Sequence, residues 1–228
     1  MDISLHYEEW GQGEPLILLH GNGEDLSYFK RQIEYFSGNY HVIALDTRGH
    51  GKSPRGERPF TLKQFAKDLK AFLDSRNLKR VHLLGFSDGG NIALIFALKY
   101  PSYVDKLIIN GANLYPSGVT LRCQLSVMRE YLRLLWRSEK TGTAEGRATK
   151  RELMRLMIKE PHIRFKDLKA LQMPVLVIAG TKDMIKRSHT ERIARWIPTG
   201  KLILIEGDHF IAAKNSEAFN QAVEKFLK

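Results

Sequence analysis

A buried strand leads directly into a helix near residue 87, and a serine stands at the junction. The apolar run Val81–Leu84 is followed by Gly85-Phe-Ser-Asp-Gly89, and a helical pattern starts with Asn91. The two glycines let the backbone turn sharply where a Cβ would clash, so we expect the hydroxyl of Ser87 to stand clear of the sheet. The pattern predicts a nucleophile elbow. A plain Gly-rich connection, one that binds an anion, would have the same residues.

Strand and helix patterns alternate along the rest of the chain. Continuous apolar runs are typical of strands buried on both faces, and each is followed by apolar residues at helical spacing. This alternation predicts an α/β domain with a mostly parallel, doubly wound sheet covered by helices on both faces. The expected strands are residues 3–7 (an edge strand), 16–19, 41–45, 81–84, 106–109, 174–180 and 201–205; besides the helix after Ser87, the expected helices are residues 28–36, 62–73 (capped by Thr61), 191–196 and 218–227.

Residues 113–170 differ from the sequence on either side. They hold two amphipathic helical stripes, separated by a break at 141–146 and ended by Pro161, and they show no strand pattern. We therefore expect a short helical lid inserted into a core domain of residues 1–112 and 171–228. The lid carries 13 Lys or Arg against 6 Asp or Glu, within a chain whose net charge is +11. Solvated helical faces would explain this excess, and so would attraction of an anionic substrate or surface.

Composition excludes several classes of protein. Basic residues are not interleaved with aromatics on a recognisable module, so no nucleic-acid partner is expected. The single Cys123 cannot form a disulfide within the chain. The N-terminus lacks the pattern of a signal peptide, and no apolar run approaches the ~20 residues that span a bilayer. These features predict a cytoplasmic protein with no integral membrane contact, and they leave the oligomeric state open.

Polar residues close or follow the predicted strands at the end where ligands bind in such sheets. They include a serine, a carboxylate and a histidine in the chain order Ser, Asp, His, which is the order of hydrolases with this fold. The residues are His20, Asn22, Asp46, Ser87, Asn110, Asp183 and His209.

Five motifs in sequence order make the whole chain resemble α/β-hydrolase-fold serine hydrolases. They are His20-Gly-Asn22, Asp46-Thr-Arg-Gly-His-Gly-Lys-Ser53, Gly85-Phe-Ser-Asp-Gly-Gly90, Gly180-Thr-Lys-Asp183 and Gly207-Asp-His-Phe210. The resemblance implies that Ser87 is the nucleophile, His209 the base and Asp183 the acid, and that no metal or cofactor is needed.

Other histidines and acids compete for these roles. Asp208 is adjacent to His209, and neighbouring residues seldom aim their side chains at each other. We interpret His20 and His50 as structural hydrogen-bonding residues. Asp46 and Arg48 are expected to pair and brace their loop as scaffold. The remaining histidines are interpreted as packed or edge residues in strands, or as residues away from strand ends: His6, His41, His82, His162 and His189.

An oxyanion hole needs two donors that face the developing charge. We expect them to be the backbone N–H groups of Asp88 and Asn22, with the Asn22 side chain as a further donor; a simple tight turn at 20–23 is the alternative. For the lid, Met128, Tyr131 and Trp136 are expected either to line an apolar acyl pocket or to pack as ordinary core.

Asp88 bears on the charge of the substrate. The segment Ser87-Asp-Gly-Gly90 is similar to that of hydrolases related to valacyclovirase, which cleave esters of amino acids, and this resemblance implies a cationic group on the substrate. The basic lid would favour an anion instead, and Asp88 could simply stabilise the first turn of its helix. Anionic and amino-bearing esters therefore both remain open.

The function that follows is hydrolysis of a small carboxylic ester or thioester through an acyl-enzyme. Lactonases and carbon–carbon bond hydrolases use the same triad, whereas epoxide hydrolases and haloalkane dehalogenases carry an aspartate where Ser87 stands. A ligand-binding receptor on a hydrolase scaffold, with little turnover, is one alternative. A protein that binds anionic surfaces through the basic insertion is another.

Overall fold

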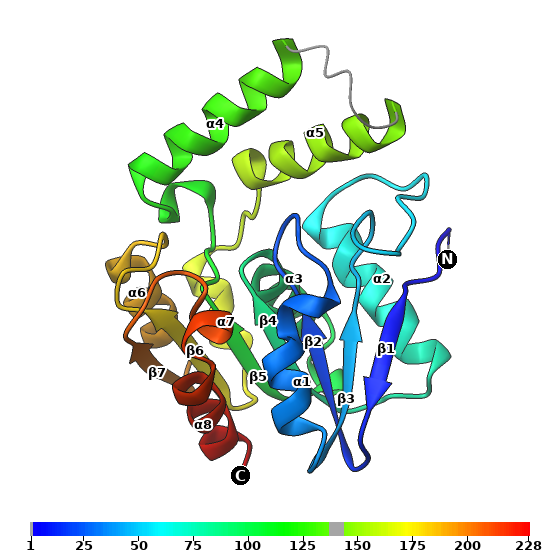
Figure 1. Ribbon diagram of the computed structural model, residues 1–228. Coiled ribbons are helices and arrows are strands. Elements are labelled where there is room, and N and C mark those ends of the chain that lie inside the picture. Colours follow the sequence, from blue (N-terminus) through cyan, green and yellow to red (C-terminus); the bar gives the residue numbers. More distant parts are fainter. Residues whose placement is uncertain (1, 137–143) are drawn as a thin grey trace.

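The computed structural model describes residues 2–136 and 144–228, and within them a seven-stranded sheet forms the centre of the protein (Figure 1). The strand order is β1-β3-β2-β4-β5-β6-β7. Strands β2 to β7 are parallel, and β1 pairs with β3 in the antiparallel sense. The predicted doubly wound, mostly parallel sheet is thus confirmed. The strands are β1 (Tyr7–Trp10), β2 (Glu14–Leu19), β3 (Tyr40–Leu45), β4 (Val81–Phe86), β5 (Val104–Asn110), β6 (Val175–Gly180) and β7 (Gly200–Ile205).

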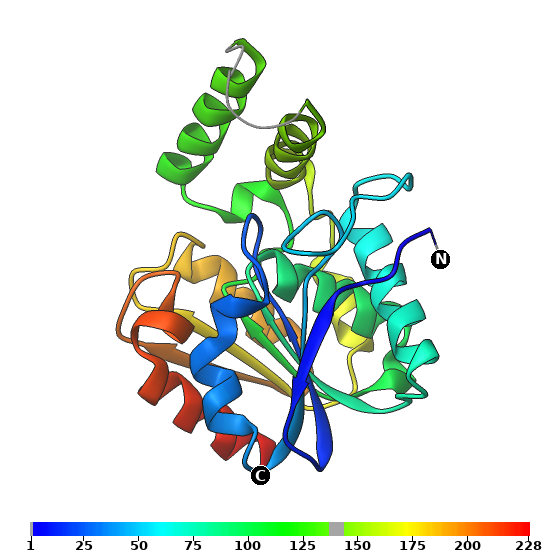
Figure 2. The same cartoon turned by 45° about the vertical axis from the view of Figure 1, so that its right-hand side comes forward.

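Helices cover both faces of the sheet (Figures 1 and 2). One face is covered by α2 (Leu62–Ser75), α3 (Asp88–Lys99) and α6 (Arg187–Trp196). The other is covered by α1 (Lys30–Phe36), α7 (Ile211–Lys214) and α8 (Ser216–Leu227). Helix α7 has four residues, too few to produce a periodic pattern, and the sequence did not indicate it.

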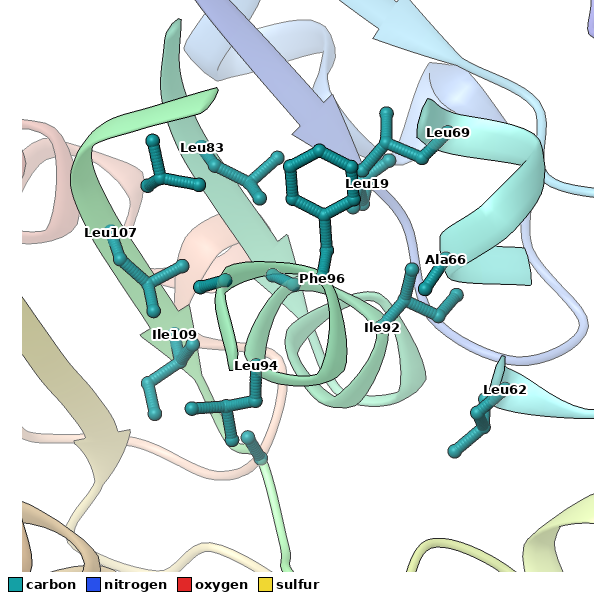
Figure 3. Close-up of a cluster of buried hydrophobic side chains, with 14 of the residues drawn as sticks. Leu19, Leu62, Ala66, Leu69, Leu83, Ile92, Leu94, Phe96, Leu107 and Ile109 are labelled. Carbon is teal, nitrogen blue, oxygen red and sulfur yellow. The ribbon is translucent and has the colours of Figure 1, made fainter. Parts of the chain in front are cut away.

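The elbow helix α3 lies in the middle of one of these cores. Its side chains pack between strands β4 and β5 on one side and helix α2 on the other, as Figure 3 shows for Ile92 and Phe96. Thr61 caps α2 as expected, because its side chain accepts a hydrogen bond from the backbone N–H of Gln64 at 3.1 Å. Fully buried apolar side chains on both faces fix the position of Ser87 at the end of β4.

The N-terminal segment does not form the predicted strand at residues 3–7. Ile3 and Leu5 are buried, which produces the alternating pattern of a half-buried strand. However, the backbone of His6 bonds to the loop after β3 rather than to a strand: its N–H donates to Ser53 Oγ at 2.8 Å, and its carbonyl accepts from the N–H of Asp46. The strand itself starts only at Tyr7.

Two helices stand beyond the carboxyl ends of the strands, and we call them the lid helices (Figures 1 and 2). They are α4 (Leu121–Trp136) and α5 (Ala144–Lys159), and they lie within the predicted insertion. The break expected at 141–146 is wrong in part, because residues 144–146 already belong to α5; residues 141–143 lie outside the described ranges. A single glycine costs a helix only about 1 kcal/mol, so Gly146 is tolerated there.

Helix α5 is tied to the core domain by polar contacts. Glu152 forms a bidentate ion pair with Arg55, at 2.6 and 2.8 Å. The carbonyl of Leu153 accepts a hydrogen bond from Asn22 Nδ2 at 3.1 Å. Just past its end, Glu160 accepts one from the backbone N–H of Leu62 at 2.8 Å. Helix α4 packs mainly on α5, and among its described residues one, Leu134, is buried.

Candidate functional site

Ser87 sits on a strained turn between β4 and α3. Its φ is 53° and its ψ is −118°, a conformation that side chains other than glycine rarely adopt. A Cβ at Gly85 would lie 2.3 Å from the carbonyl oxygen of Gly89, and one at Gly89 would lie 2.0 Å from that of Leu19. Both flanking glycines are therefore required by close backbone approach. The turn matches the strand–elbow–helix geometry expected from the sequence.

The structure brings Ser87 together with the predicted base and acid. His209 Nε2 lies 3.0 Å from Ser87 Oγ, and His209 Nδ1 lies 2.7 Å from Asp183 Oδ1. These three residues come from the ends of β4, β6 and β7. The imidazole and the carboxylate are almost fully buried, so their interaction is little screened by water. A carboxylate held on Nδ1 fixes the tautomer that leaves Nε2 free to accept a proton from the serine.

The competing acid and histidines lie elsewhere. Asp208 pairs instead with Lys214 and accepts a hydrogen bond from the N–H of Phe210. His20 bonds the carbonyl of Gly21 and accepts from the N–H of Thr47, at 2.7 and 3.0 Å. Burial lowers the pKa of His20, and it lowers that of His50 to about 4, so both stay neutral at physiological pH. Their structural role is confirmed.

The expected pairing of Asp46 with Arg48 is wrong. Asp46 instead accepts from the backbone N–H groups of Leu26 and Lys52, both at 2.8 Å, and from His6. Arg48 turns the other way, toward Asp2 and Asp68. Two residues apart on a tight turn, the two side chains diverge, and each braces a different part of the scaffold.

The two backbone groups expected to form the oxyanion hole are unpaired in the described parts of the chain. The N–H of Asp88 belongs to the first residue of α3, where the helix offers no acceptor. The N–H of Asn22 has no acceptor either. The Asn22 side chain, by contrast, is already engaged: its Nδ2 donates to Asp88 Oδ2 at 3.0 Å and to the Leu153 carbonyl. It is therefore not a free donor for a substrate.

A cavity of about 180 Å³ opens beside Ser87, between the core domain and the lid helices. It is smaller than most pockets for drug-sized ligands, which fits a small acyl group. Of the three lid residues expected at a pocket, Met128 lines the cavity. Tyr131 and Trp136 do not, and Trp136 is 85% exposed. The cavity is lined by Ser87, Asp88, Asn113, Pro116, Val119, Cys123, Gln124, Val127, Met128, Met157, Ile158, Glu160, Met184 and Ile185.

Two carboxyl groups reach this cavity, and none of its lining residues is a Lys, Arg or His. Burial raises the pKa of Asp88, and donation from Asn22 and Asn91 only partly offsets the effect. Burial also raises the pKa of Glu160. The cavity is therefore lined by two carboxyl groups and by no basic side chain, although the lid as a whole is basic.

A third carboxyl group, Glu24, supports the loop that carries Asn22. Its Oε2 accepts a hydrogen bond from the backbone N–H of Gly21 at 3.1 Å. Burial raises its pKa to about 7, an effect that the Gly21 donor and the nearby His209 partly oppose. Glu24 is thus a titratable group close to both the imidazole and the oxyanion loop.

Sequence reasoning did not single out four residues of the site. Gly111 packs so closely on the His–Asp pair that a Cβ there would lie 2.7 Å from the imidazole of His209. Asn91, Glu24 and Glu160 reach the site through loops and helices. Gly111 directly follows the last residue of β5, and its φ is +62°. A glycine at a strand end is the only local sequence signal that could have marked any of the four residues.

The described residues contain no cluster of three His, Cys, Asp or Glu that could hold a metal ion. Over the same ranges, none of the helices combines the length and apolar character needed to cross a bilayer.

Comparison with known proteins agrees with the observed fold. Residues 14–135 match the family model for the alpha/beta hydrolase fold. The chain is 31% identical to serine hydrolase BPHL of Mus musculus, over 99% of this chain and 84% of the relative. It is 28% identical to 3-oxoadipate enol-lactonase 2 of Acinetobacter baylyi, over 100% and 94% of the two chains. A solved thermophilic esterase from Thermogutta terrifontis superposes with a TM-score of 0.83 at 26% identity, covering 99% and 93%.

Proposed function

The chain belongs to the α/β-hydrolase family of serine hydrolases, and on that premise we propose that it cleaves a small carboxylic ester or thioester through an acyl-enzyme formed on Ser87. The observation that carries the proposal is the pair of hydrogen bonds that links Ser87 Oγ, His209 and Asp183 in one line. Hydrolase names among the relatives support the reaction class.

In the first half of the reaction, His209 Nε2 takes the proton of Ser87 as Oγ attacks the carbonyl carbon. Asp183 stabilises the imidazolium that results. The N–H groups of Asn22 and Asp88 bind the oxyanion of the tetrahedral intermediate, aided by the positive end of the α3 dipole. His209 then gives its proton to the leaving alkoxide or thiolate, and the acyl group stays on Ser87.

In the second half, water enters and His209 takes a proton from it. The hydroxide attacks the acyl carbon, the same two N–H groups hold the second oxyanion, and Ser87 leaves with the proton returned by His209. The products are a carboxylic acid and the free enzyme. No group other than water and the chain's own residues is required.

The cavity favours uncharged or amino-bearing acyl groups over anionic ones. Asp88 and Glu160 both reach it, and a substrate carboxylate would be repelled by either one in its ionised form. An ammonium group would be attracted. The basic residues of the lid do not line the cavity, so they do not offset this preference.

Lactone hydrolysis is a second candidate, because a lactone is an internal ester that the same residues would open. The 3-oxoadipate enol-lactonase relative, aligned over the full length of this chain, favours it. Side-by-side kinetics on a neutral lactone, a matched linear ester and a matched thioester would rank these substrates.

The test of the proposal is Ser87→Ala, which removes the nucleophile and little else. It should lower hydrolysis of a short p-nitrophenyl ester by about 10⁴-fold or more, with circular dichroism unchanged. A fluorophosphonate probe should label the wild type on Ser87 and leave the variant unlabelled. Undiminished hydrolysis in the variant, or labelling without turnover of any ester, lactone or thioester in the wild type, would contradict it; the latter result would favour a receptor.

A further inference from the structure

Helix α4 carries an apolar stripe on its outer side. The six side chains are between 41% and 85% exposed: Leu121, Leu125, Met128, Leu132, Leu135 and Trp136. Among the large apolar side chains that the structure describes, the only other exposed one is Tyr35. A stripe of this kind, gathered on one element, marks an interaction surface rather than scattered surface residues.

The spacing places these side chains in one continuous row. The first five follow one another in steps of four, three, four and three residues along the helix. Trp136 comes directly after Leu135 and, at 100° per residue, lies beside Leu125 around the helix axis, so all six share one side. The inner side of α4 is also apolar, and it is already occupied: Val127 and Cys123 line the cavity, and Leu134 is buried. Met128 stands at the border of the two sides, since it lines the cavity and is also 41% exposed. The other five side chains of the row are additional to what the fold itself requires.

Arginines border this row along one edge. At 100° per residue, Arg122 and Arg129 lie next to Leu125 and Trp136 around the helix axis. Both arginines are exposed, and neither has an ion-pair partner in the described ranges. An apolar row with Leu and Trp, flanked by Arg, is the pattern of a helix that lies in the headgroup region of an anionic bilayer.

A second copy of the chain would cover the row less well. Pairing two α4 helices would bring their arginine edges together without an acidic counterpart.

We propose that α4 docks on an anionic lipid surface, with its outer row in the interface and Arg122 and Arg129 beside the lipid phosphates. The inner side of the same helix lines the cavity next to Ser87. Docking would place the mouth of the cavity close to the membrane, where apolar esters concentrate. The binding needs no catalytic residue, so it stands or falls independently of the proposed hydrolysis.

The experiment is co-sedimentation with vesicles of phosphatidylcholine, with and without phosphatidylglycerol. The wild type should bind the anionic vesicles more tightly, and added salt should weaken the binding. Leu125→Ser combined with Leu132→Ser should weaken it at least about tenfold. Arg122→Glu combined with Arg129→Glu should do so too. The matched control, Lys67→Glu combined with Lys201→Glu, makes the same charge change on exposed core-domain residues and should bind like the wild type.

Hydrolysis of a short soluble ester and circular dichroism serve as checks that each variant folds. If the leucine variant does not fold, the arginine variant still decides. The proposal is overturned if the wild type does not bind anionic vesicles. It is also overturned if neither the leucine variant nor the arginine variant binds them more weakly than the wild type does. A dimer in sedimentation velocity that the leucine variant dissociates, without vesicle binding by the wild type, would assign the row to a second copy instead.

Discussion

Two aspartates lie close to His209 in sequence or in space, and their surroundings differ. Asp183 is buried, and its Oδ1 accepts from both the imidazole and the N–H of Ile185. Asp208 is half exposed and paired with Lys214. The first can fix the tautomer of the imidazole, and the second cannot.

Asp183→Asn should therefore lower kcat for ester hydrolysis by about 10⁴-fold, because an amide stabilises the wrong tautomer of His209. Asp208→Asn, the matched control, should retain activity within about threefold. Steady-state kinetics on one ester compares them. Similar losses in both variants would show that Asp183 has no special role.

Glu24 should make the stability of the protein depend on pH. Its pKa is about 7 in the folded state, above the 4.5 of an exposed glutamate, because burial disfavours its charge. The folded state therefore holds a proton that the unfolded state releases, and stability falls as pH rises from about 4.5 to about 7.

Glu24→Gln removes this effect while keeping an acceptor for the N–H of Gly21. The Tm of the variant minus the Tm of the wild type should be about 2–4 °C larger at pH 8 than at pH 5, after allowance for partial exposure of the carboxyl. Differential scanning calorimetry at the two pH values measures the change. A constant Tm difference would mean that the carboxyl titrates normally in the folded protein.

The residues of the proposed triad could be predicted because each ends an apolar strand inside a motif. Glu24, Asn91 and Glu160 could not, because their importance comes from burial beside the site and not from any local pattern. The Asp46–Arg48 pairing failed for a related reason: sequence proximity on a tight turn says nothing about which way two side chains point.

At the scale of elements, the elbow depends on the contact between α3 and β2. Gly89→Ala would place a Cβ 2.0 Å from the carbonyl oxygen of Leu19, and backbone on both sides would have to shift. We expect a loss of about 1–3 kcal/mol in the free energy of unfolding, together with a large loss of activity.

Gly38→Ala is the matched control, because a Cβ at Gly38 meets no heavy atom within 4 Å. It should be neutral in both assays. Urea denaturation and ester hydrolysis measure the pair, and a Gly89→Ala protein that behaves like Gly38→Ala would show that the elbow is not constrained as described.

Strands buried on both faces were the most predictable elements, because a short continuous apolar run is compatible with few other structures in a chain of this composition. The segment at residues 3–7 misled the prediction because burial of alternate residues does not require strand pairing. Met128 and Trp136, which belong to the row on α4, were expected to line a pocket or to pack as core, since an amphipathic pattern does not reveal which of two apolar sides faces inward.

At the scale of the whole molecule, Arg48 joins three segments that are distant in sequence. Its guanidinium is fully buried and makes paired hydrogen bonds to Asp68 on α2 and to Asp2 near the N-terminus, all between 2.7 and 2.8 Å. It also donates to the carbonyl of Arg55 in the loop that contacts α5. Its hydrogen bonds hold the pKa of Asp2 well below its usual range.

Arg48→Met should lower the free energy of unfolding by about 3–5 kcal/mol, because the carboxylate of Asp68 would remain buried without its positively charged partner. Arg31→Met breaks an exposed pair with Glu34 and should change it by less than about 0.5 kcal/mol. Urea denaturation of both variants measures the contrast. Equal changes in the free energy of unfolding would mean that the buried ion pair of Arg48 contributes no more to stability than an exposed one.

The carboxamide of Asn22 has a consequence for how distant parts of the molecule affect one another. Both of its hydrogens are in use, one on Asp88 in the elbow helix and one on Leu153 in the lid. A displacement of α5 therefore releases a donor immediately next to the proposed oxyanion position. A change in the position of the lid would thus change the hydrogen-bond donors around the reacting carbonyl, through the amide of Asn22 alone.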